Sequence, residues 1–69
     1  MSDEDERVRK VKYIIDTKLS VADKTIIILY AQYRSYRKLG KRMGLSHMTM
    51  RNECIRIRKI ILKEYERLH

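Results

Sequence analysis

Proline is absent from this 69-residue chain, and glycine occurs only twice, at Gly40 and Gly44. Without proline, the sequence contains no residue that would break a helix by removing a backbone donor. Apolar and polar residues also seldom alternate with the two-residue period of a strand. These features together predict an all-α fold.

A single cysteine excludes an internal disulfide, and two histidines beside it are too few for a zinc finger. The longest apolar run, residues 26–31, falls far short of the roughly 20 residues that cross a bilayer. The acidic, charged start "MSDEDERVRK" has neither the pattern of a signal peptide nor that of a transit peptide. We therefore expect no metal, no cofactor and no membrane partner, and a cytoplasmic location.

A chain of this length forms one small domain that buries only about 60% of the surface of its unfolded chain. It has no room for a catalytic cleft between two layers. No serine–histidine–acid set or pair of carboxylates has a pocket in which to act. We expect a protein that is not an enzyme and that functions through its outer surface.

Charge is unevenly distributed along the sequence, which carries a net charge of +8. Residues 1–24 contain six acids and six bases, whereas residues 25–69 contain eleven bases against three acids. A basic half in a small protein points first to the phosphates of a nucleic acid. The alternative is a cationic surface that simply faces solvent.

Four helices are predicted, each of the last three preceded by a serine that can cap it. The first covers about residues 5–18, with an apolar stripe formed by Val8, Val11, Ile14, Ile15 and Leu19. The others cover residues 21–33 after Ser20, 36–43 after Ser35, and from after Ser46 to about residue 68. The run "TIIILYA" could also form a strand, but the preceding "SVAD", a capping-box pattern, favours a helix that is buried on most sides.

The two glycines are spaced as a helix-turn-helix requires. One position of that motif lies where the two helices cross closely and accepts only a small residue, which fits Gly40. The other opens the turn in a left-handed conformation, which fits Gly44. The motif also needs inward-facing apolar residues, and these would be Leu39, Met43, Leu45 and Met50. The alternative is that Gly44 ends an ordinary helix between two unrelated helices.

The segment "SYRKLGKRMGLSHMTMR" resembles region four of bacterial sigma factors, the helix-turn-helix that reads the −35 promoter element. The resemblance runs from about Ser20 to Leu62 and rests on five matches: Ser35-Tyr36, Leu39-Gly40, Met43-Gly44-Leu45-Ser46, Thr49-Met50-Arg51 and the run "RIRKIIL". Gly40 stands where the family has alanine, which we interpret as a steric match, and Tyr33 where it commonly has glycine. The sigma regions that hold core polymerase and melt the −10 element have no counterpart here.

On this basis we divide the chain into residues 1–19, an acidic start with the first helix, and residues 20–69, a helix-turn-helix domain similar to sigma region four. On the fourth helix, a periodicity of 100° per residue places one set of side chains on the core: Met50, Cys54, Ile57, Ile61 and Leu68. A second set near the helix start would face base edges: His47, Met48, Arg51 and Asn52. The resemblance implies base contacts from the same four positions.

Phosphate contacts are predicted around this helix, from the amides at its N-terminus and from surrounding polar and basic side chains. The candidates are Arg34, Arg37, Lys38, Lys41, Ser46, Thr49 and Arg56. The sequence thus favours a transcription factor that binds duplex DNA at a promoter or operator. The alternatives are a module that docks on RNA polymerase, as sigma region four docks on the β flap, and a dimeric phage-type regulator or packaging subunit.

Overall fold

A computed structural model describes residues 3–68, except the side chain of Asp3. These residues form four α-helices and no strand: α1 (Asp3–Lys18), α2 (Val21–Tyr33), α3 (Tyr36–Met43) and α4 (His47–Arg67). The predicted all-α fold is confirmed, and the helices begin and end within two residues of the expected positions. No helix in this part of the chain is long and apolar enough to cross a membrane. The division at residues 19 and 20 stays a prediction.

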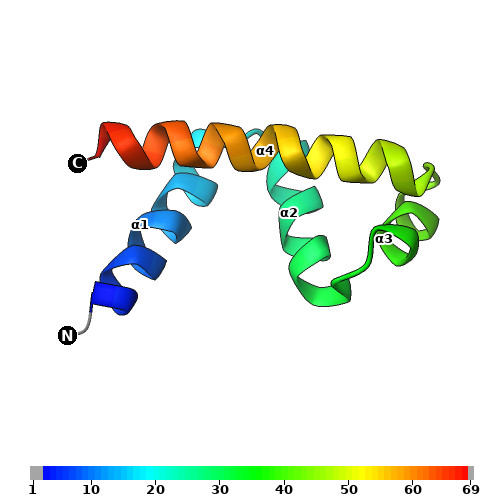
Figure 1. Cartoon of the computed structure of the whole chain (residues 1–69), viewed down its shortest axis with the longest axis horizontal. Helices are drawn as coiled ribbons and strands as arrows, with labels where there is room; N and C mark the ends of the chain where they lie inside the picture. Colours follow the sequence, from blue (N-terminus) through cyan, green and yellow to red (C-terminus); the bar gives the residue numbers. More distant parts are fainter. Residues whose placement is uncertain (1–2, 69) are drawn as a thin grey trace.

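Helix α4 is a long rod on which the other three helices pack (Figure 1). The described chain measures 38 × 21 × 17 Å along its principal axes. α3 lies against the N-terminal end of α4, α2 lies near its middle, and α1 packs on its C-terminal half and diverges from α2 (Figure 1). The two ends of the rod therefore have different neighbours.

The helix starts are fixed by the three serines that the sequence indicated. Each serine hydroxyl accepts a hydrogen bond from the backbone amide three residues later, at 3.2 Å for Ser20, 3.3 Å for Ser35 and 3.1 Å for Ser46. Such bonds satisfy amides that have no partner within the first turn of a helix. The capping residues thus define where three of the four helices begin.

The core lies where α2 and α3 meet α4. One buried side chain, Ile14 of α1, lies outside this core. The core itself consists of fully or almost fully buried side chains from α2, α3, α4 and the α1–α2 link: Leu19, Ile26, Leu39, Met50, Cys54 and Ile57. Three of these lie on the predicted inner face of α4. Cys54 is confirmed as a small buried side chain, and burial raises the pKa of its thiol.

Several side chains that we expected in the core are exposed. Met43 and Leu45 flank the turn, which carries them outward, so that 37% and 48% of their surfaces stay accessible. Helix α2 has a single buried residue, Ile26, because it packs on one side only. Leu68 follows the last residue of α4 and is exposed. Val8 is also exposed, and it belongs to the N-terminal half of α1, which extends away from α4 (Figure 1). A fold of this size has too few elements to cover both faces of every helix.

Gly40 lies at a very close approach between α3 and the turn that follows it. A Cβ atom on Gly40 would lie 2.5 Å from the carbonyl oxygen of Leu45 and 3.4 Å from the amide nitrogen of His47. The Gly40 carbonyl also accepts the amide of Leu45, at 2.9 Å, and that of Gly44. The interpretation of glycine as a steric match for alanine is therefore wrong, because even alanine would force the backbone of the turn to move.

Gly44 has a different role, because a Cβ atom at this position would meet no atom of the described chain beyond its sequence neighbours within 4 Å, and space is therefore not limiting. Its φ of 73° and ψ of 29° are left-handed, which lets its amide close the end of α3 on the Gly40 carbonyl. Residues with a Cβ reach this conformation at a cost of roughly 1–2 kcal/mol. The two glycines thus meet the two demands that the sequence assigned to them, one of space and one of conformation.

An ion pair joins the start of α2 to the middle of α4. The Arg56 guanidinium donates to both carboxylate oxygens of Asp23, at 2.6 and 3.1 Å, and to Oε2 of Glu53, at 2.7 and 3.2 Å. Hydrogen bonding to Arg56 lowers the pKa of the Asp23 carboxyl. Because 46% of the Arg56 side chain is exposed, solvent screens the pair and limits its effect on stability.

We predict that Gly40→Ala lowers the free energy of unfolding by about 2 kcal/mol, because the turn must move to admit the methyl group. Gly40→Val should be at least as destabilising. Gly44→Ala should cost about 1 kcal/mol, since only its conformation is strained, and Gly44→Asn less. Urea denaturation followed by circular dichroism measures all four. A Gly40→Ala protein as stable as the wild type would contradict the close approach.

We also predict a pH-dependent contribution from Asp23. Its pKa is lowered in the folded state, so the ion pair stabilises the fold above the ordinary aspartate pKa of about 3.9 and is lost as the pH falls through the lowered value. Asp23→Asn should therefore reduce the unfolding free energy by about 1 kcal/mol at pH 7. That deficit should shrink in acid. The control is Asp16→Asn on the exposed surface of α1, and a deficit that stayed constant with pH would count against the pair.

Candidate nucleic-acid interface

The turn at Gly44 leads directly into a capped helix start. Ser46 accepts the amide of Thr49 at 3.1 Å, and the hydroxyls of Ser46 and Thr49 lie 2.9 Å apart. The first turn of any helix leaves further amides with no partner in the helix. Those amides and the positive end of the helix dipole favour an anion at this point.

The four predicted base-reading residues share the first two turns of α4. His47, Met48, Arg51 and Asn52 are all exposed, and Met48 keeps 52% of its surface accessible. The intervening Met50 is fully buried against the core and fixes the rotation of the helix. The structure therefore brings these four side chains together on an open surface at one end of the molecule.

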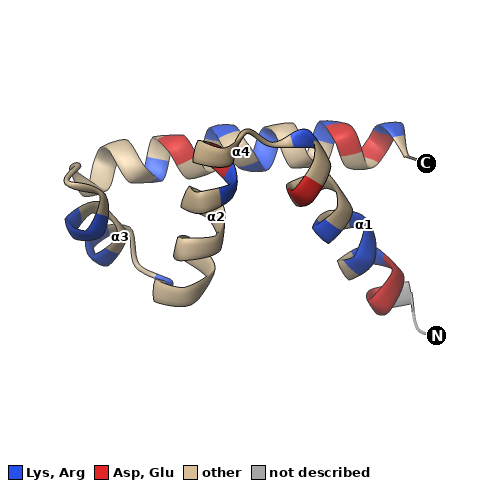
Figure 2. Cartoon of the chain, turned by 180° about the vertical axis from the view of Figure 1, so that it is seen from behind, with Lys and Arg blue, Asp and Glu red and all other residues tan. Residues whose placement is uncertain are grey.

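Cationic side chains surround this end of α4. Arg34 lies between α2 and α3, whereas Arg37, Lys38 and Lys41 lie on α3, and all four are exposed. Figure 2 shows the basic positions on α3 beside the start of α4, with most acidic positions on α1 and the rest of α4. Arg42 is a further exposed base on α3 that our prediction left out, although the run "RSYRKLGKR" contains it.

An acid-free stretch explains why this end is so strongly basic. Residues 24–52 contain seven lysines and arginines and neither aspartate nor glutamate. The bordering acids, Asp23 and Glu53, both contact Arg56. The positive potential around the start of α4 is thus not neutralised by neighbouring carboxylates.

Arg56 itself is engaged elsewhere. Its guanidinium donates to two carboxylates, and the resulting ion pairs hold it between α2 and α4. A phosphate would have to compete with both partners. We therefore assign no phosphate contact to Arg56, although the charge pattern alone predicts one.

Arg58 and two tyrosines form a second structural contact between helices. The Arg58 guanidinium lies 5.2 Å from the centre of the Tyr30 ring, and that ring stacks on Tyr36 with 4.8 Å between centroids. Hydrogen bonding with Tyr30 and burial raise the pKa of Tyr36. Both rings pack against the core, so these two tyrosines contribute to helix packing.

Arg34 combines an exposed cation with an unusual backbone. Its φ of 50° and ψ of 32° are left-handed, and its amide donates to the carbonyl of Tyr30 at 2.7 Å, ending α2. The sigma-like pattern places a glycine at Tyr33, one residue earlier, but Tyr33 is the last residue of α2. The position at which glycine would relieve strain in this chain is therefore Arg34.

Comparison with known protein families identifies the arrangement. Residues 17–58 match the family described as "Helix-turn-helix domain". The chain belongs to this family. The matched segment runs from the end of α1 to the middle of α4 and contains the turn and all four base-reading candidates. No curated protein and no solved structure matched the chain.

Membership in the helix-turn-helix family confirms the motif that the two glycines indicated, and it points to DNA as the partner. It does not single out sigma region four among proteins that carry this motif. Many regulators share a helix-turn-helix. The helix-turn-helix and its exposed second helix are therefore the firm basis for a functional proposal.

We predict that Arg34→Gly raises the unfolding free energy by about 0.5 kcal/mol. Relief of the left-handed strain outweighs the greater flexibility of glycine in the unfolded chain. Arg34→Ala removes the same charge but keeps the strain, so it serves as the matched control. A glycine variant less stable than the alanine variant in urea denaturation would show that the Arg34 side chain itself stabilises the fold.

Proposed function

We propose that this protein binds duplex DNA sequence-specifically, with the first two turns of α4 in the major groove. The observation that supports this most directly is the exposed set His47, Met48, Arg51 and Asn52 at the start of α4, in a stretch of sequence, residues 24–52, that contains neither aspartate nor glutamate. A major groove is wide enough to admit an α-helix. A helix-turn-helix contacts bases with the N-terminal residues of its second helix.

Each reading residue has a chemistry that suits a base edge. Arg51 can donate two hydrogen bonds to O6 and N7 of guanine, and Asn52 can pair with N6 and N7 of adenine. Met48 offers an apolar contact to a thymine methyl group, and His47 offers a ring nitrogen to a neighbouring base. Good bidentate contacts discriminate against a wrong base by about 1–3 kcal/mol each.

Phosphate contacts would come from the bases around the reading helix and from its first-turn amides. We assign them to exposed residues on and beside α3 and at the start of α4: Arg34, Arg37, Lys38, Lys41, Arg42, Ser46 and Thr49. With about five phosphates neutralised, the logarithm of the binding constant should fall with the logarithm of salt concentration at a slope near −4.5. This term is independent of sequence and positions the reading residues.

The biological role that we propose is non-catalytic regulation of transcription. The resemblance to sigma region four supports recognition of a bacterial or phage promoter or operator. The part that we assign to this domain is recognition of the DNA sequence. Selection of duplexes from a random pool, with core polymerase absent and then present, would test binding and a polymerase-dependent role separately.

We predict that Arg51→Ala weakens binding to the selected duplex by about ten-fold or more, because a bidentate contact is lost. Its circular dichroism spectrum and melting temperature should stay unchanged, since Arg51 is exposed. Fluorescence anisotropy measures both this loss and the salt slope. Lys41→Ala should instead weaken binding to all duplexes similarly and lower the slope by about 1.

The matched control for both variants is Lys63→Ala, an exposed base in the C-terminal part of α4. It removes one positive charge, as both variants do, but at a distance from the reading surface. If the three variants lost affinity equally, binding would be non-specific charge attraction. If no sequence were enriched from the random pool, the base-reading assignment would fail.

A further inference from the structure

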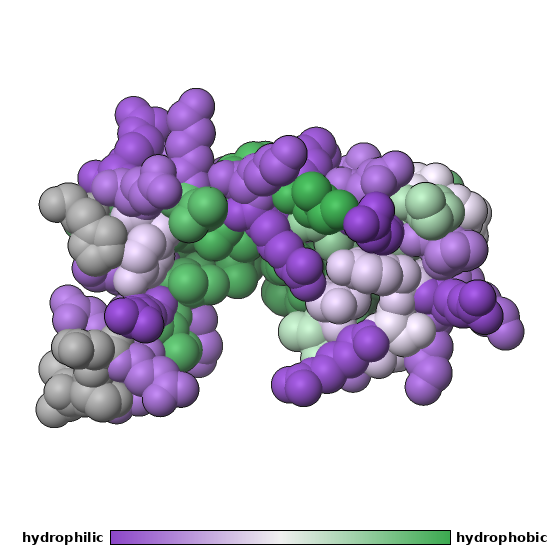
Figure 3. Space-filling model, viewed as in Figure 1, coloured by the Kyte–Doolittle hydropathy of each residue, from purple (hydrophilic) through white to green (hydrophobic). Residues whose placement is uncertain are grey.

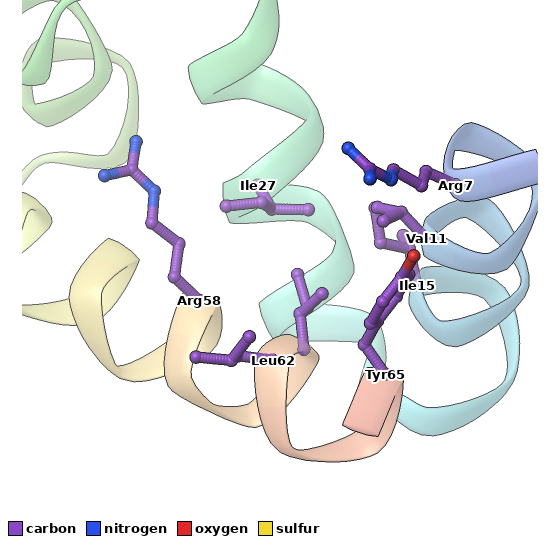
Figure 4. Close-up of a pocket in the computed structure, with 8 residues that line it drawn as sticks. Arg7, Val11, Ile15, Ile27, Arg58, Leu62 and Tyr65 are labelled. Atoms are coloured by element: carbon purple, nitrogen blue, oxygen red, sulfur yellow. The ribbon is translucent and has the colours of Figure 1, made fainter. Parts of the chain in front are cut away.

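A second surface lies away from the reading residues, in an apolar groove between α1, α2 and α4. It has a volume of about 700 Å³ and is lined by Arg7, Val11, Ile15, Ile27, Arg58, Ile61, Leu62 and Tyr65. Apolar side chains come from all three helices, as Figure 4 shows, and apolar surface is visible in the notch between α1 and α2 in Figure 3. Leu62 keeps 59% of its surface exposed. An open apolar surface of this kind commonly receives a partner.

The wall formed by α1 carries a regular stripe along its open side. Five residues, which we call the α1 stripe, recur at spacings of four, three, four and three: Glu4, Val8, Val11, Ile15 and Lys18. This is the heptad spacing of a helix that packs on another helix. Val8 is 49% exposed, while Val11 and Ile15 are half-buried and line the groove. Part of the apolar surface of the stripe is therefore left uncovered by the described part of the chain.

The two ends of the α1 stripe carry opposite charges. Glu4 lies in the first turn of α1 and Lys18 is its last residue, and both side chains are exposed. If a second stripe ran parallel, glutamate would meet glutamate and lysine would meet lysine. If it ran antiparallel, Glu4 of each copy would meet Lys18 of the other, with Val8, Val11 and Ile15 between them.

We propose that the partner in the groove is a second copy of this chain. The α1 helices pair antiparallel about a two-fold axis near Val11, and each stripe covers the open side of the other copy's groove. Such an interface is self-complementary, as two-fold symmetry demands.

The reading surface stays free in this dimer. The groove and α1 lie toward the C-terminal half of α4, whereas α3 and the reading residues lie at its other end (Figure 1). The proposal therefore does not rest on DNA binding. An experiment on oligomeric state can support or overturn it whether or not the DNA-binding proposal holds.

The test begins with sedimentation equilibrium of the full chain in the absence of DNA. We expect a mass of twice 8.4 kDa that falls to the monomer mass on dilution. Val8→Glu should raise the dimer dissociation constant by at least about ten-fold, since two buried valines are lost per dimer. Tyr13→Glu is the matched control, because Tyr13 is 52% exposed on the opposite face of α1 and should leave the constant unchanged.

Charge exchange then tests the antiparallel direction. Glu4→Lys and Lys18→Glu should each weaken the dimer, because each places like charges at both ends of the interface. When the two variants are mixed, heterodimers should form in preference to either homodimer, since opposite charges meet again. Glu6→Lys, which changes the same turn of α1 on its other face, should have no effect.

A chain that remains monomeric at every concentration would overturn the proposal, even if another protein bound the groove. A dimer weakened equally by Val8→Glu and Tyr13→Glu would show that α1 is not the interface. A mixture of the two charge variants without preferred heterodimers would rule out the antiparallel arrangement. Circular dichroism of each variant distinguishes lost pairing from lost folding.

Discussion

The close approach of two backbones at Gly40 is the constraint on which this molecule depends. Because no side chain separates α3 from the carbonyl of Leu45, the chain can reverse within three residues and place α3 across the start of α4. Leu39 and Met50 then meet in the core on either side of that turn. The same reversal turns His47 and Arg51 outward. The absence of a side chain at Gly40 thus determines both how α3 packs on α4 and which residues α4 exposes.

The charged residues likewise fall into two groups, those that join helices to one another and those that lie on the exposed surface. The two acids that border the acid-free stretch, Asp23 on α2 and Glu53 on α4, both contact Arg56. That contact ties α2 to α4 and neutralises the local carboxylates. The bases of α3 are left without acidic neighbours in sequence, which supports the phosphate contacts that we propose for them. The ion pair therefore serves the interface indirectly, although Arg56 lies outside it.

Local signals in the sequence were enough to predict the helices, their serine caps, the turn and the exposure of the residues at the start of α4, because each depends on neighbours within a few positions. Features that depend on distant contacts were missed. Arg56 meets Asp23 across 33 positions, which no periodicity reveals. The exposure of Met43 and Leu45 reflects the small number of helices available to cover them. Alanine at position 40 would clash with the carbonyl oxygen of Leu45, and the sequence alone does not reveal that this oxygen lies so close to Gly40.

Helix α4 connects the two surfaces that we propose. Its 21 residues form a continuous rod about 32 Å long, with the reading residues at one end and the floor of the apolar groove toward the other. Because α4 is unbroken, a partner that fixes the position of the groove also fixes the position of the reading residues. Pairing through α1 would therefore set the separation of two reading surfaces. A dimer of this kind would select its DNA by the spacing of two half-sites as well as by their bases.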